Sequence, residues 1–506
     1  MSNILRLHEL DNVGICKVAL PAGTHLITSN LRLTTDVPAL HKVALRDINK
    51  DEPILKYGQT MGFANQFIAE GAHVHVHNCV MGDADKDYGF CSKAVPTQFV
   101  ATSARAAFRG YRRANGKVGT RNFIGILTTV NCSATVARAI AQHLSFSGEL
   151  RDYPNVDGVV ALTHETGCGM SSDGEGYETL RRTFDGYARH PNFGGVLMVG
   201  LGCETMQVNR VLEESGLAAS DTFCSYTIQD SGGTRSSIEK GIAALRAMLP
   251  SVNKFQRDTF PASELTVGLQ CGGSDALSGV TANPALGIAG DILIRHGGTV
   301  ILSETPEIYG AEHLLTQRAT SPQVAEQLLA RIRWWEDYTA RNHVELNNNP
   351  SPGNKAGGLT TIMEKSLGAQ AKSGSTNLNG VYLYAQHIEQ KGLVFMDSPG
   401  YDPVSATGQI ASGAQIICFT TGRGSAFGCK PAPCIKLSSN TQLYERMRDD
   451  IDINCGGVLD GEISLEECGE KIFRHILKIA SGEATKSELL GYGDNEFTPW
   501  KIGATV

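Results

Sequence analysis

Short runs of apolar and β-branched residues alternate with amphipathic stretches along most of the chain after residue 111. Such runs are typical of buried strands, and apolar residues at every third or fourth position are typical of helices that cover a sheet. The pattern predicts strands at 123–130, 156–163, 196–201, 222–228, 265–269, 299–303 and 416–420. It predicts helices at 134–144, 175–189, 236–248, 282–295, 323–339 and 465–480. This order indicates an α/β fold with mostly parallel sheets.

The first part of the chain follows a different pattern. Its apolar pieces are short and are separated by Gly, Pro, Asn and Asp, which predicts a small β-rich domain. Residues 93–110 lack a clear period and are rich in small residues, so we expect a linker there. The chain is therefore divided into a β-rich domain at 1–92, a linker at 93–110, an α/β middle domain at 111–254 and an α/β C-terminal domain at 255–506.

Composition narrows the class of partner. The net charge of -7 argues against a nucleic acid or an anionic membrane as the main partner, and it is compatible with local basic sites for an anionic small molecule. No apolar run approaches the roughly 18 residues that span a bilayer. The N-terminus carries charges inside its apolar stretch, unlike a signal peptide. Thirteen cysteines in such a chain predict reduced thiols in the cytoplasm.

Three successive predicted strands of the middle domain end in cysteine, at Cys132, Cys168 and Cys203. The carboxyl ends of parallel strands share one edge of a sheet, so we expect these thiols to lie near one another. Asn131 and three ionisable residues accompany them: His164, Glu165 and Glu204. Three buried small hydrophobes are the alternative. Ionisable groups at buried strand ends need partners, however, which favours a functional cluster.

A second candidate site follows the predicted strand at 265–269. There the turn Cys271-Gly272-Gly273-Ser274-Asp275 leads into a helix. Glycines let the backbone approach a ligand, and open α/β sheets bind ligands at the carboxyl ends of their strands. A tight connection that contains an ordinary buried cysteine is the alternative.

Histidines alternate with other residues in the N-terminal domain. His73, His75 and His77 are predicted to point to one face of a strand, where they would bind a metal or a carboxylate, and His41 is a possible fourth member. A solvated edge strand is the alternative.

Two basic residues are candidates for anion binding. Lys355 lies in a Gly/Pro/Asn-rich loop at 347–358, and Arg423 stands between glycines after the strand at 416–420.

Nine stretches together resemble one known family. They are HKVALRDI (41–48), VHVHN (74–78), YRRANGKVGTRN (111–122), TVNC (129–132), HETGCG (164–169), GLGCE (200–204), CGGSDALSGVTANP (271–284), NPSPGNKAGG (349–358) and TTGRG (420–424). By these residues the chain resembles the altronate dehydratase and galactarate dehydratase family, whose N-terminal module is a SAF-type domain. SETPEIYGAEHLL (303–315) and VHVHN look closer to the altronate branch, whereas GCKPAPCIK (428–436) and DINCGG (452–457) look like a separate subgroup.

The resemblance implies a hydro-lyase that converts altronate to 2-keto-3-deoxygluconate and water. Galactarate or another aldonate or aldarate is the alternative substrate. A sulfo-lyase acting on a sulfo-hydroxy acid and a non-catalytic sugar-acid binding protein are further alternatives. The resemblance also implies dependence on Fe²⁺, with Mn²⁺ as a possible substitute. It leaves open whether the protein is a homo-oligomer.

The reaction needs a base for the C2 proton and an acid for the C3 oxygen. We expect His164 to be the base, and Glu165 or Glu204 to be the acid or a metal ligand. Arg423 and Lys355 are expected to hold the substrate carboxylate. Further substrate or metal contacts are expected from Asn131, Ser274, Asp275 and Glu304.

The form of the iron has two interpretations. One is a mononuclear Fe²⁺ held by histidines, with His75 and His77 as candidates, and by carboxylates. The other is an iron–sulfur cluster held by three or four of Cys132, Cys168, Cys203 and Cys271.

Overall fold

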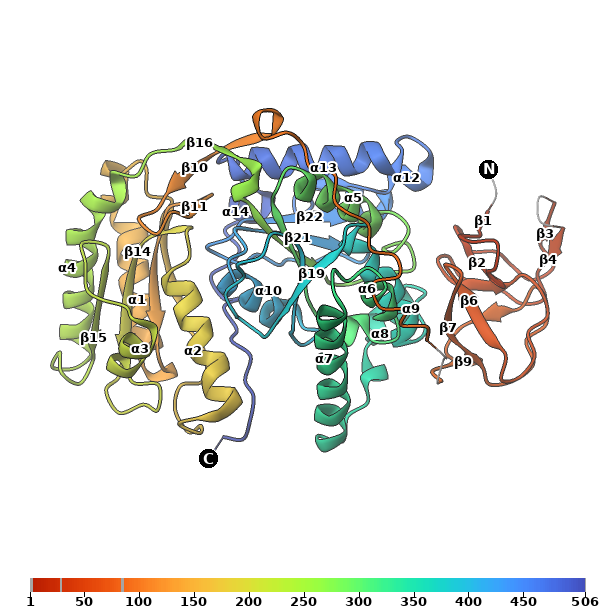
Figure 1. The fold of residues 1–506 in the computed structure, drawn as a ribbon, viewed down its shortest axis with the longest axis horizontal. Coiled ribbons are helices and arrows are strands. Elements are labelled where there is room, and N and C mark those ends of the chain that lie inside the picture. The colour runs from red at the N-terminus through yellow and green to blue at the C-terminus, as the bar shows by residue number, and fades with distance from the viewer. Residues whose placement is uncertain (1–2, 28–29, 83–85, 506) are drawn as a thin grey trace.

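The computed structural model describes residues 3–27, 30–82 and 86–505. Figure 1 shows three bodies in a row, with the C-terminal domain between the middle domain on the left and the N-terminal domain on the right. Within the described ranges, no helix is long and apolar enough to cross a membrane.

The N-terminal domain is built from short antiparallel strands, which confirms the predicted β-rich class. One sheet contains β1 (Ile4–Leu5), β2 (Val13–Cys16), β5 (Lys42–Ala44) and β8 (His73–Val74). A second contains β6 (Pro53–Lys56), β7 (Gln59–Ala64) and β9 (Cys79–Val80), and β3 (His25–Leu26) pairs with β4 (Leu31–Arg32). Strand β8 ends at Val74, so the histidine-rich segment is mostly turn rather than the longer strand that its alternation predicts.

The predicted linker ends in regular structure. After a single turn at Thr102–Ala104, β10 (Ala107–Arg112) pairs antiparallel with β11 (Val118–Gly119) and with β16 (Asp258–Pro261). Phe108 packs against Phe260, with ring centroids 6.3 Å apart. One partner of this strand, β16, lies about 150 residues further along the chain, beyond the reach of a local pattern.

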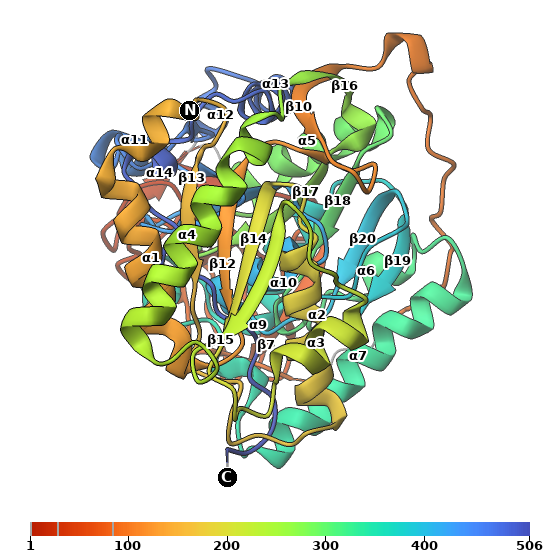
Figure 2. The ribbon, with the colours of Figure 1, turned by 90° about the vertical axis from the view of Figure 1, so that its left-hand side faces the viewer.

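The middle domain contains a four-stranded parallel sheet in the order β13-β12-β14-β15. The strands are β12 (Phe123–Thr128), β13 (Gly158–Leu162), β14 (Phe193–Gly200) and β15 (Phe223–Thr227). The helices are α1 (Ala134–Ser147), α2 (Gly174–Ala188), α3 (Val208–Ser215) and α4 (Thr234–Asn253). Figure 2 shows α1 and α4 on one face of this sheet and α2 and α3 on the other.

The C-terminal domain contains a seven-stranded parallel sheet in the order β19-β20-β18-β17-β21-β22-β23. The strands are β17 (Thr266–Cys271), β18 (Thr299–Leu302), β19 (Leu378–Tyr382), β20 (Gly392–Met396), β21 (Ile416–Thr421), β22 (Cys434–Ser438) and β23 (Ile453–Asn454). Its longer helices are α5 (Ala282–Arg295), α7 (Pro322–Arg341), α9 (Ile362–Gln370), α10 (Asp402–Ala411) and α13 (Leu465–Ala480). The shorter ones are α6 (His313–Thr316), α8 (Pro352–Ala356), α11 (Thr441–Arg446), α12 (Gly457–Asp460) and α14 (Lys486–Leu489).

Helix α8 lies in the segment predicted to be a loop. Ser351 caps it through a capping box with Asn354, in which Ser351 Oγ accepts from the Asn354 amide and Asn354 Oδ1 accepts from the Ser351 amide. The helix has only one turn, and the Gly, Pro and Asn content of the segment is typical of a loop, so the pattern did not predict it.

One buried carboxylate fastens the N-terminal domain to the C-terminal domain. Glu364 of α9 lies 2.8 Å from Lys42 Nζ and 2.8 Å from Lys56 Nζ, and all three side chains are buried. It also accepts hydrogen bonds from the Thr360 amide and hydroxyl. Burial raises the pKa of Glu364, but the two lysines outweigh burial and hold that pKa below its ordinary value. The contact is therefore an ion pair at neutral pH.

Replacing Glu364 with glutamine should destabilise this interface strongly. The substitution leaves two buried ammonium groups without a counter-charge, which costs about 3–5 kcal/mol for a buried pair. Urea unfolding of the full chain measures the change. The control is Glu52→Gln, which removes a partly exposed pair with Arg46 and should change stability by less than about 0.5 kcal/mol. Equal effects of the two substitutions would contradict this role of Glu364.

Candidate active site

The carboxyl ends of two adjacent strands bring a thiol and two carboxylates together. Cys271 is the last residue of β17, and Glu304 and Glu307 follow β18 on one turn. Cys271 Sγ lies 3.4 Å from Glu307 Oε2 and 4.0 Å from Glu304 Oε2. All three side chains are buried. The edge of the seven-stranded sheet therefore holds a compact group of ionisable side chains.

Each glutamate has its own lysine. Lys365 Nζ of α9 lies 2.6 Å from Glu307 Oε1, and Lys372 Nζ lies 3.5 Å from Glu304 Oε2. Asn349 joins the first pair, since its Nδ2 donates to Glu307 Oε1 at 2.9 Å and its Oδ1 accepts from Lys365 at 2.8 Å. Within the part of the chain that the structure describes, Glu304 Oε1 is buried without a hydrogen-bond partner.

The surroundings shift the pKa values of the two carboxyl groups in opposite directions. Burial raises the pKa of Glu304 well above its ordinary value, and the charge of Glu307 raises it further. Burial also raises the pKa of Glu307, but Lys365 and then Lys372 outweigh burial and lower that pKa. A neutral carboxyl group thus lies beside a charged carboxylate. Such a pair is the usual arrangement of an acid and a base in one site.

Two further groups complete the surroundings. Burial raises the pKa of Cys271 to about 12, so its sulfur is a neutral thiol. Asp402 begins α10, and its pKa is raised to about 7 by burial and by Glu307. A Cβ at Gly272 would lie 2.3 Å from Asp402 Oδ2. A side chain at 272 would therefore force Asp402 and Phe419 to move.

The backbone at Glu304 is strained. Its φ is 71°, in the left-handed region that non-glycine residues rarely occupy, at a cost of about 1–3 kcal/mol. The Glu304 amide donates to Ser398 Oγ at 3.0 Å, which helps to hold this conformation. Strain of this kind is concentrated at functional sites, and here it directs the Glu304 side chain toward Cys271.

The turn after β17 brings several predicted residues to the same edge. The Arg423 amide donates to the Gly273 carbonyl at 2.8 Å, and the Ser274 carbonyl accepts from Asn354 of α8. Lys355 is the next residue of that helix. The Asp275 carboxylate accepts from two backbone amides and from the side chains of Ser278, Ser439 and Asn440. Through these hydrogen bonds, Asp275 holds the turn in place.

Cys271 follows a strand of a different sheet from the three cysteines of the middle domain. Cys132, Cys168 and Cys203 follow adjacent strands of the four-stranded sheet and are exposed. Cys271 is buried at the edge of a different sheet, where it contacts Glu304 and Glu307. The structure thus places one of the four predicted cluster ligands on a different sheet from the other three. A cluster held by three or four of these cysteines stays a prediction.

His164 occupies a buried position among backbone groups. Its Nε2 lies 2.9 Å from the Thr128 carbonyl, and its Nδ1 accepts from the Thr166 amide at 3.2 Å. Burial lowers its pKa to about 4. Both ring nitrogens are therefore engaged, and this geometry does not favour the predicted role of base.

Glu204 is held in a similar way. Its Oε1 accepts from Thr129 Oγ1 at 2.7 Å and from the Leu201 amide at 3.1 Å, and its Oε2 accepts from the Gly202 amide. The carboxylate closes the turn after β14 and is buried.

Asn131 and Glu165 line an open cavity of about 590 Å³ at this edge of the middle domain. Arg138 and Lys501 contribute positive charge to it, and Tyr401 extends its lining to the residue before Asp402. The cavity is large enough for a sugar acid. A residue predicted to contact the substrate, Asn131, and a residue predicted to be the acid or a metal ligand, Glu165, therefore face a space that extends toward the C-terminal site.

Three histidines of the N-terminal domain form a separate group. One ring nitrogen from each of His41, His73 and His75 lies within 4.8 Å of the other two. Burial, followed by the charge of neighbouring groups, lowers the pKa of His73 to about 4 and that of His75 to about 3. The rings are therefore neutral at pH 7, which is the form that binds metals.

The donor set of this trio fits a divalent transition metal. His75 Nδ1 is buried and has no hydrogen-bond partner within the described ranges. His41 Nε2 lies 3.5 Å from the Ala356 carbonyl at the end of α8, so the trio borders the segment that carries Lys355. His77 lies outside the trio, with its ring 5.2 Å from that of His73. His41 takes the place predicted for His77.

Sequence reasoning missed four residues of the buried site: Glu307, Lys365, Lys372 and Asp402. Glu307 had a signal, since it lies three residues after Glu304 behind a predicted strand. The two lysines lie on short helices with no clear period in the sequence, about 60 residues after the glutamates.

Family comparisons cover nearly the whole chain. An altronate/galactarate dehydratase SAF domain matches residues 2–82, the second domain of D-galactarate dehydratase/altronate hydrolase matches 110–253, and the C-terminal domain of D-galactarate/altronate dehydratase matches 262–505. The chain belongs to the D-galactarate/altronate dehydratase family. This membership places it among the hydro-lyases.

Three relatives are similar over almost their full length. The altronate dehydratase of Bacillus subtilis is 34% identical, with 100% of both chains covered. The altronate dehydratase of Escherichia coli is 35% identical over 99% of both chains. The galactarate dehydratase (L-threo-forming) of Escherichia coli is 39% identical over 95% of this chain and 93% of that protein. Overall identity therefore does not separate the two substrates.

Proposed function

We propose that this protein is a sugar-acid dehydratase that removes water across C2 and C3 of altronate to give 2-keto-3-deoxygluconate. The observation that carries the proposal is the Glu304 and Glu307 pair, whose pKa values are displaced in opposite directions on one turn. Dehydration needs a base and an acid of this kind within reach of neighbouring carbon atoms.

In this proposal the Glu307 carboxylate accepts the C2 proton. The neutral Glu304 carboxyl group donates its proton to the C3 hydroxyl, which leaves as water. The resulting enol tautomerises to the 2-keto acid. Lys365 and Lys372 stabilise the negative charge that develops on the substrate. Exchange with solvent returns each glutamate to its starting protonation state.

Substrate binding is assigned to the groups around this pair. Arg423 and Lys355 are proposed to hold the C1 carboxylate, because both flank the turn that contains Ser274. Asn131 and Glu165 are proposed to contact the hydroxyl groups of the substrate from the neighbouring cavity. His164 and Glu204 are assigned to holding the turns that carry them.

The histidine trio is proposed to hold the metal, Fe²⁺ with Mn²⁺ as a substitute. A divalent ion would supply Lewis-acid stabilisation of an oxygen that becomes negatively charged. The exposed Cys132, Cys168 and Cys203 keep an iron–sulfur cluster as the second candidate, since thiolates are its usual ligands. Acid-labile sulfide near zero in active, anaerobically prepared protein would exclude the cluster.

His75→Ala should reduce bound iron by at least about tenfold, because it removes one of three ligands. Iron per chain is measured by mass spectrometry after anaerobic reconstitution and desalting. His25→Ala, at an exposed histidine of the same domain, is the matched control and should leave the iron content unchanged. Undiminished iron in the His75 variant would place the metal elsewhere.

The experiment that tests the function is a turnover assay on anaerobic protein supplied with Fe²⁺. The panel contains altronate, galactarate, other hexonates and hexarates, and a sulfo-hydroxy acid. The 2-keto-3-deoxy acid product and sulfite are detected separately. Product from altronate supports the proposal, product from galactarate alone reassigns the substrate, and sulfite release reassigns the leaving group.

The setting of the reaction is also proposed. Thirteen free cysteines support a reducing compartment, and we place the protein in the cytoplasm. A homo-oligomeric state stays a prediction that sedimentation analysis tests.

A further inference from the structure

A cationic cavity lies between the middle and C-terminal domains, apart from the site described above. Its volume is about 460 Å³. Helix α2 forms one wall, and the turn before β11, the residues after β19 and the end of α10 form the others. A Cβ at Gly186 would lie 2.1 Å from the Ala411 carbonyl, so α2 and α10 are in backbone contact beside the cavity.

The cavity and the catalytic pair lie at opposite ends of the strands of the C-terminal sheet. Gly413 lines it and precedes β21, whereas Glu304 and Glu307 follow β18. Strands β21 and β18 both run parallel to β17. The cavity therefore lies at the amino ends of the strands and the catalytic pair at the carboxyl ends.

Positive charge dominates the lining. Four basic side chains face one carboxylate, Asp185, in a protein whose net charge is -7. The basic residues are Lys117, Arg181, Arg182 and Arg189. Asp185 is already engaged, since Arg189 Nε lies 2.7 Å from its Oδ1. Arg181 pairs with Glu178, which does not line the cavity.

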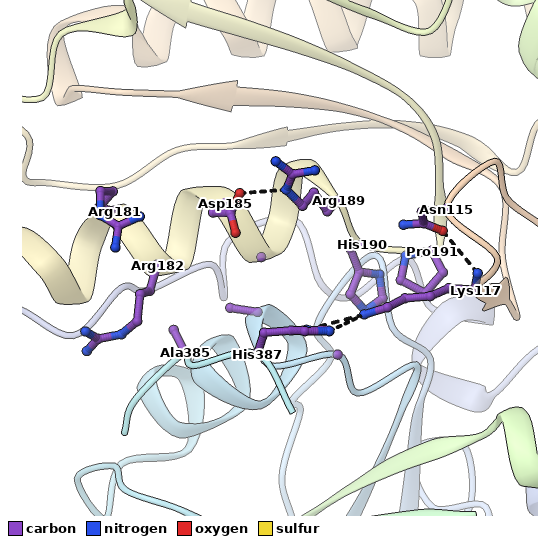
Figure 3. Close-up of a pocket in the computed structure, with 13 residues that line it drawn as sticks. Asn115, Lys117, Arg181, Arg182, Asp185, Arg189, His190, Pro191, Ala385 and His387 are labelled. Atoms are coloured by element: carbon purple, nitrogen blue, oxygen red, sulfur yellow. Dashed lines mark hydrogen bonds and ion pairs between the residues drawn. The ribbon is translucent and has the colours of Figure 1, made fainter. Parts of the chain in front are cut away.

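Two of these cations have no carboxylate within ion-pair distance among the described residues: Lys117 and Arg182. Lys117 Nζ lies 2.8 Å from His387 Nε2, and Arg182 Nε donates to the Tyr384 carbonyl at 2.9 Å. Figure 3 shows Arg182 toward one end of the cavity and Lys117 with His387 toward the other. Half-buried cations without a counter-charge are costly, and an anion would remove that cost.

The electrostatics of the lining agree with this geometry. Burial lowers the pKa of Lys117, and the charge of Lys391 lowers it further. Burial also lowers the pKa of His387, followed by the charge of Lys117. The negative charges of Asp185 and Glu389 raise the pKa values of Lys117 and His387, but they do not cancel these decreases. The cavity therefore has a net positive potential that its own acidic groups do not neutralise.

We infer that this interdomain cavity is a second binding site, for a small metabolite that carries a phosphate or carboxylate group. Guanidinium and ammonium groups are the usual ligands of such oxyanions. Cavities at domain boundaries are also common ligand sites. Because its walls come from two domains, a bound anion strengthens the contact between them. The site is independent of the proposed dehydration chemistry.

Isothermal titration of the full chain with inorganic phosphate and with malonate tests this inference and separates the two oxyanions. At about 0.15 M NaCl, which screens unspecific surface binding, we expect one site with a dissociation constant below about 1 mM for at least one probe. In Lys117→Met/Arg182→Met, affinity should fall at least tenfold. Turnover of the sugar acid should stay within about twofold of the unmodified protein.

Two comparisons make the test decisive. Lys50→Met/Arg235→Met removes two exposed cations elsewhere and should leave affinity unchanged. Lys117→Arg/Arg182→Lys keeps both charges and should retain binding, which guards against a loss caused by misfolding. Equal affinity in the unmodified protein and the methionine double variant would put the anion elsewhere and overturn the inference. Failure of both probes to bind below about 10 mM would overturn it as well.

Discussion

Replacing Glu307 with glutamine should lower kcat by about 10²–10⁴-fold, the usual contribution of a general base. Glutamine has nearly the same shape as glutamate but cannot accept the C2 proton. Glu304→Gln should cause a loss of similar size, because the amide cannot replace the proton that Glu304 gives to the leaving hydroxyl. Steady-state kinetics with the substrate found in the turnover panel measures both effects.

The matched control is Glu326→Gln on α7, where an exposed glutamate pairs with Arg333. It should leave kcat unchanged. Thermal unfolding of each variant separates a chemical loss from a folding defect. If Glu307→Gln kept activity within about threefold in folded protein, the base would have to be sought elsewhere.

Replacing Lys365 with methionine should have the second largest effect, and the effect should depend on pH. Burial raises the pKa of Glu307, and Lys365 is the strongest influence that lowers it. Without this lysine the Glu307 pKa rises, so less carboxylate is present at pH 7. Each unit that the pKa moves above 7 costs about tenfold in kcat/KM at that pH.

The direction of the shift makes the prediction specific. The rising limb of the pH profile of kcat/KM should move to higher pH in Lys365→Met, and activity should recover as the pH is raised. Glu307→Gln should show no such recovery, because it has no carboxylate to ionise. Lys478→Met, at an exposed lysine of α13, should leave the profile unchanged. A uniform loss with an unshifted profile would show that Lys365 does not set the ionisation of Glu307.

Local sequence pattern predicted part of the framework of strands and helices. The predicted helices at 282–295 and 465–480 have the observed bounds of α5 and α13, because their apolar positions repeat with the helical period and their ends carry clear signals. The alternation of strands and helices predicted the α/β class, and frequent turn residues predicted the β-rich N-terminal domain. These features depend on neighbours within a few residues.

The same local patterns predicted only part of the candidate site. The sequence singled out Cys271 and Glu304, since each follows a buried strand. It assigned Asp275 and His164 to chemistry because they are ionisable groups at strand ends. The structure gives His164 backbone partners, and Asp275 both backbone and side-chain partners, that hold turns.

The sequence by itself predicted the strands of the middle-domain sheet, the C-terminal strands β17, β18 and β21, the strand ends at which chemistry is possible and the family of the protein. Only the tertiary structure decided which strand ends meet, and it separated Cys271 from the other three cysteines by placing it in another sheet. It also placed Lys365 and Lys372 beside the two glutamates. It placed His41 beside His73 and His75. The reason is that periodicity reports contacts between near neighbours. The electrostatics of a buried site depend instead on groups that folding brings together from distant parts of the chain.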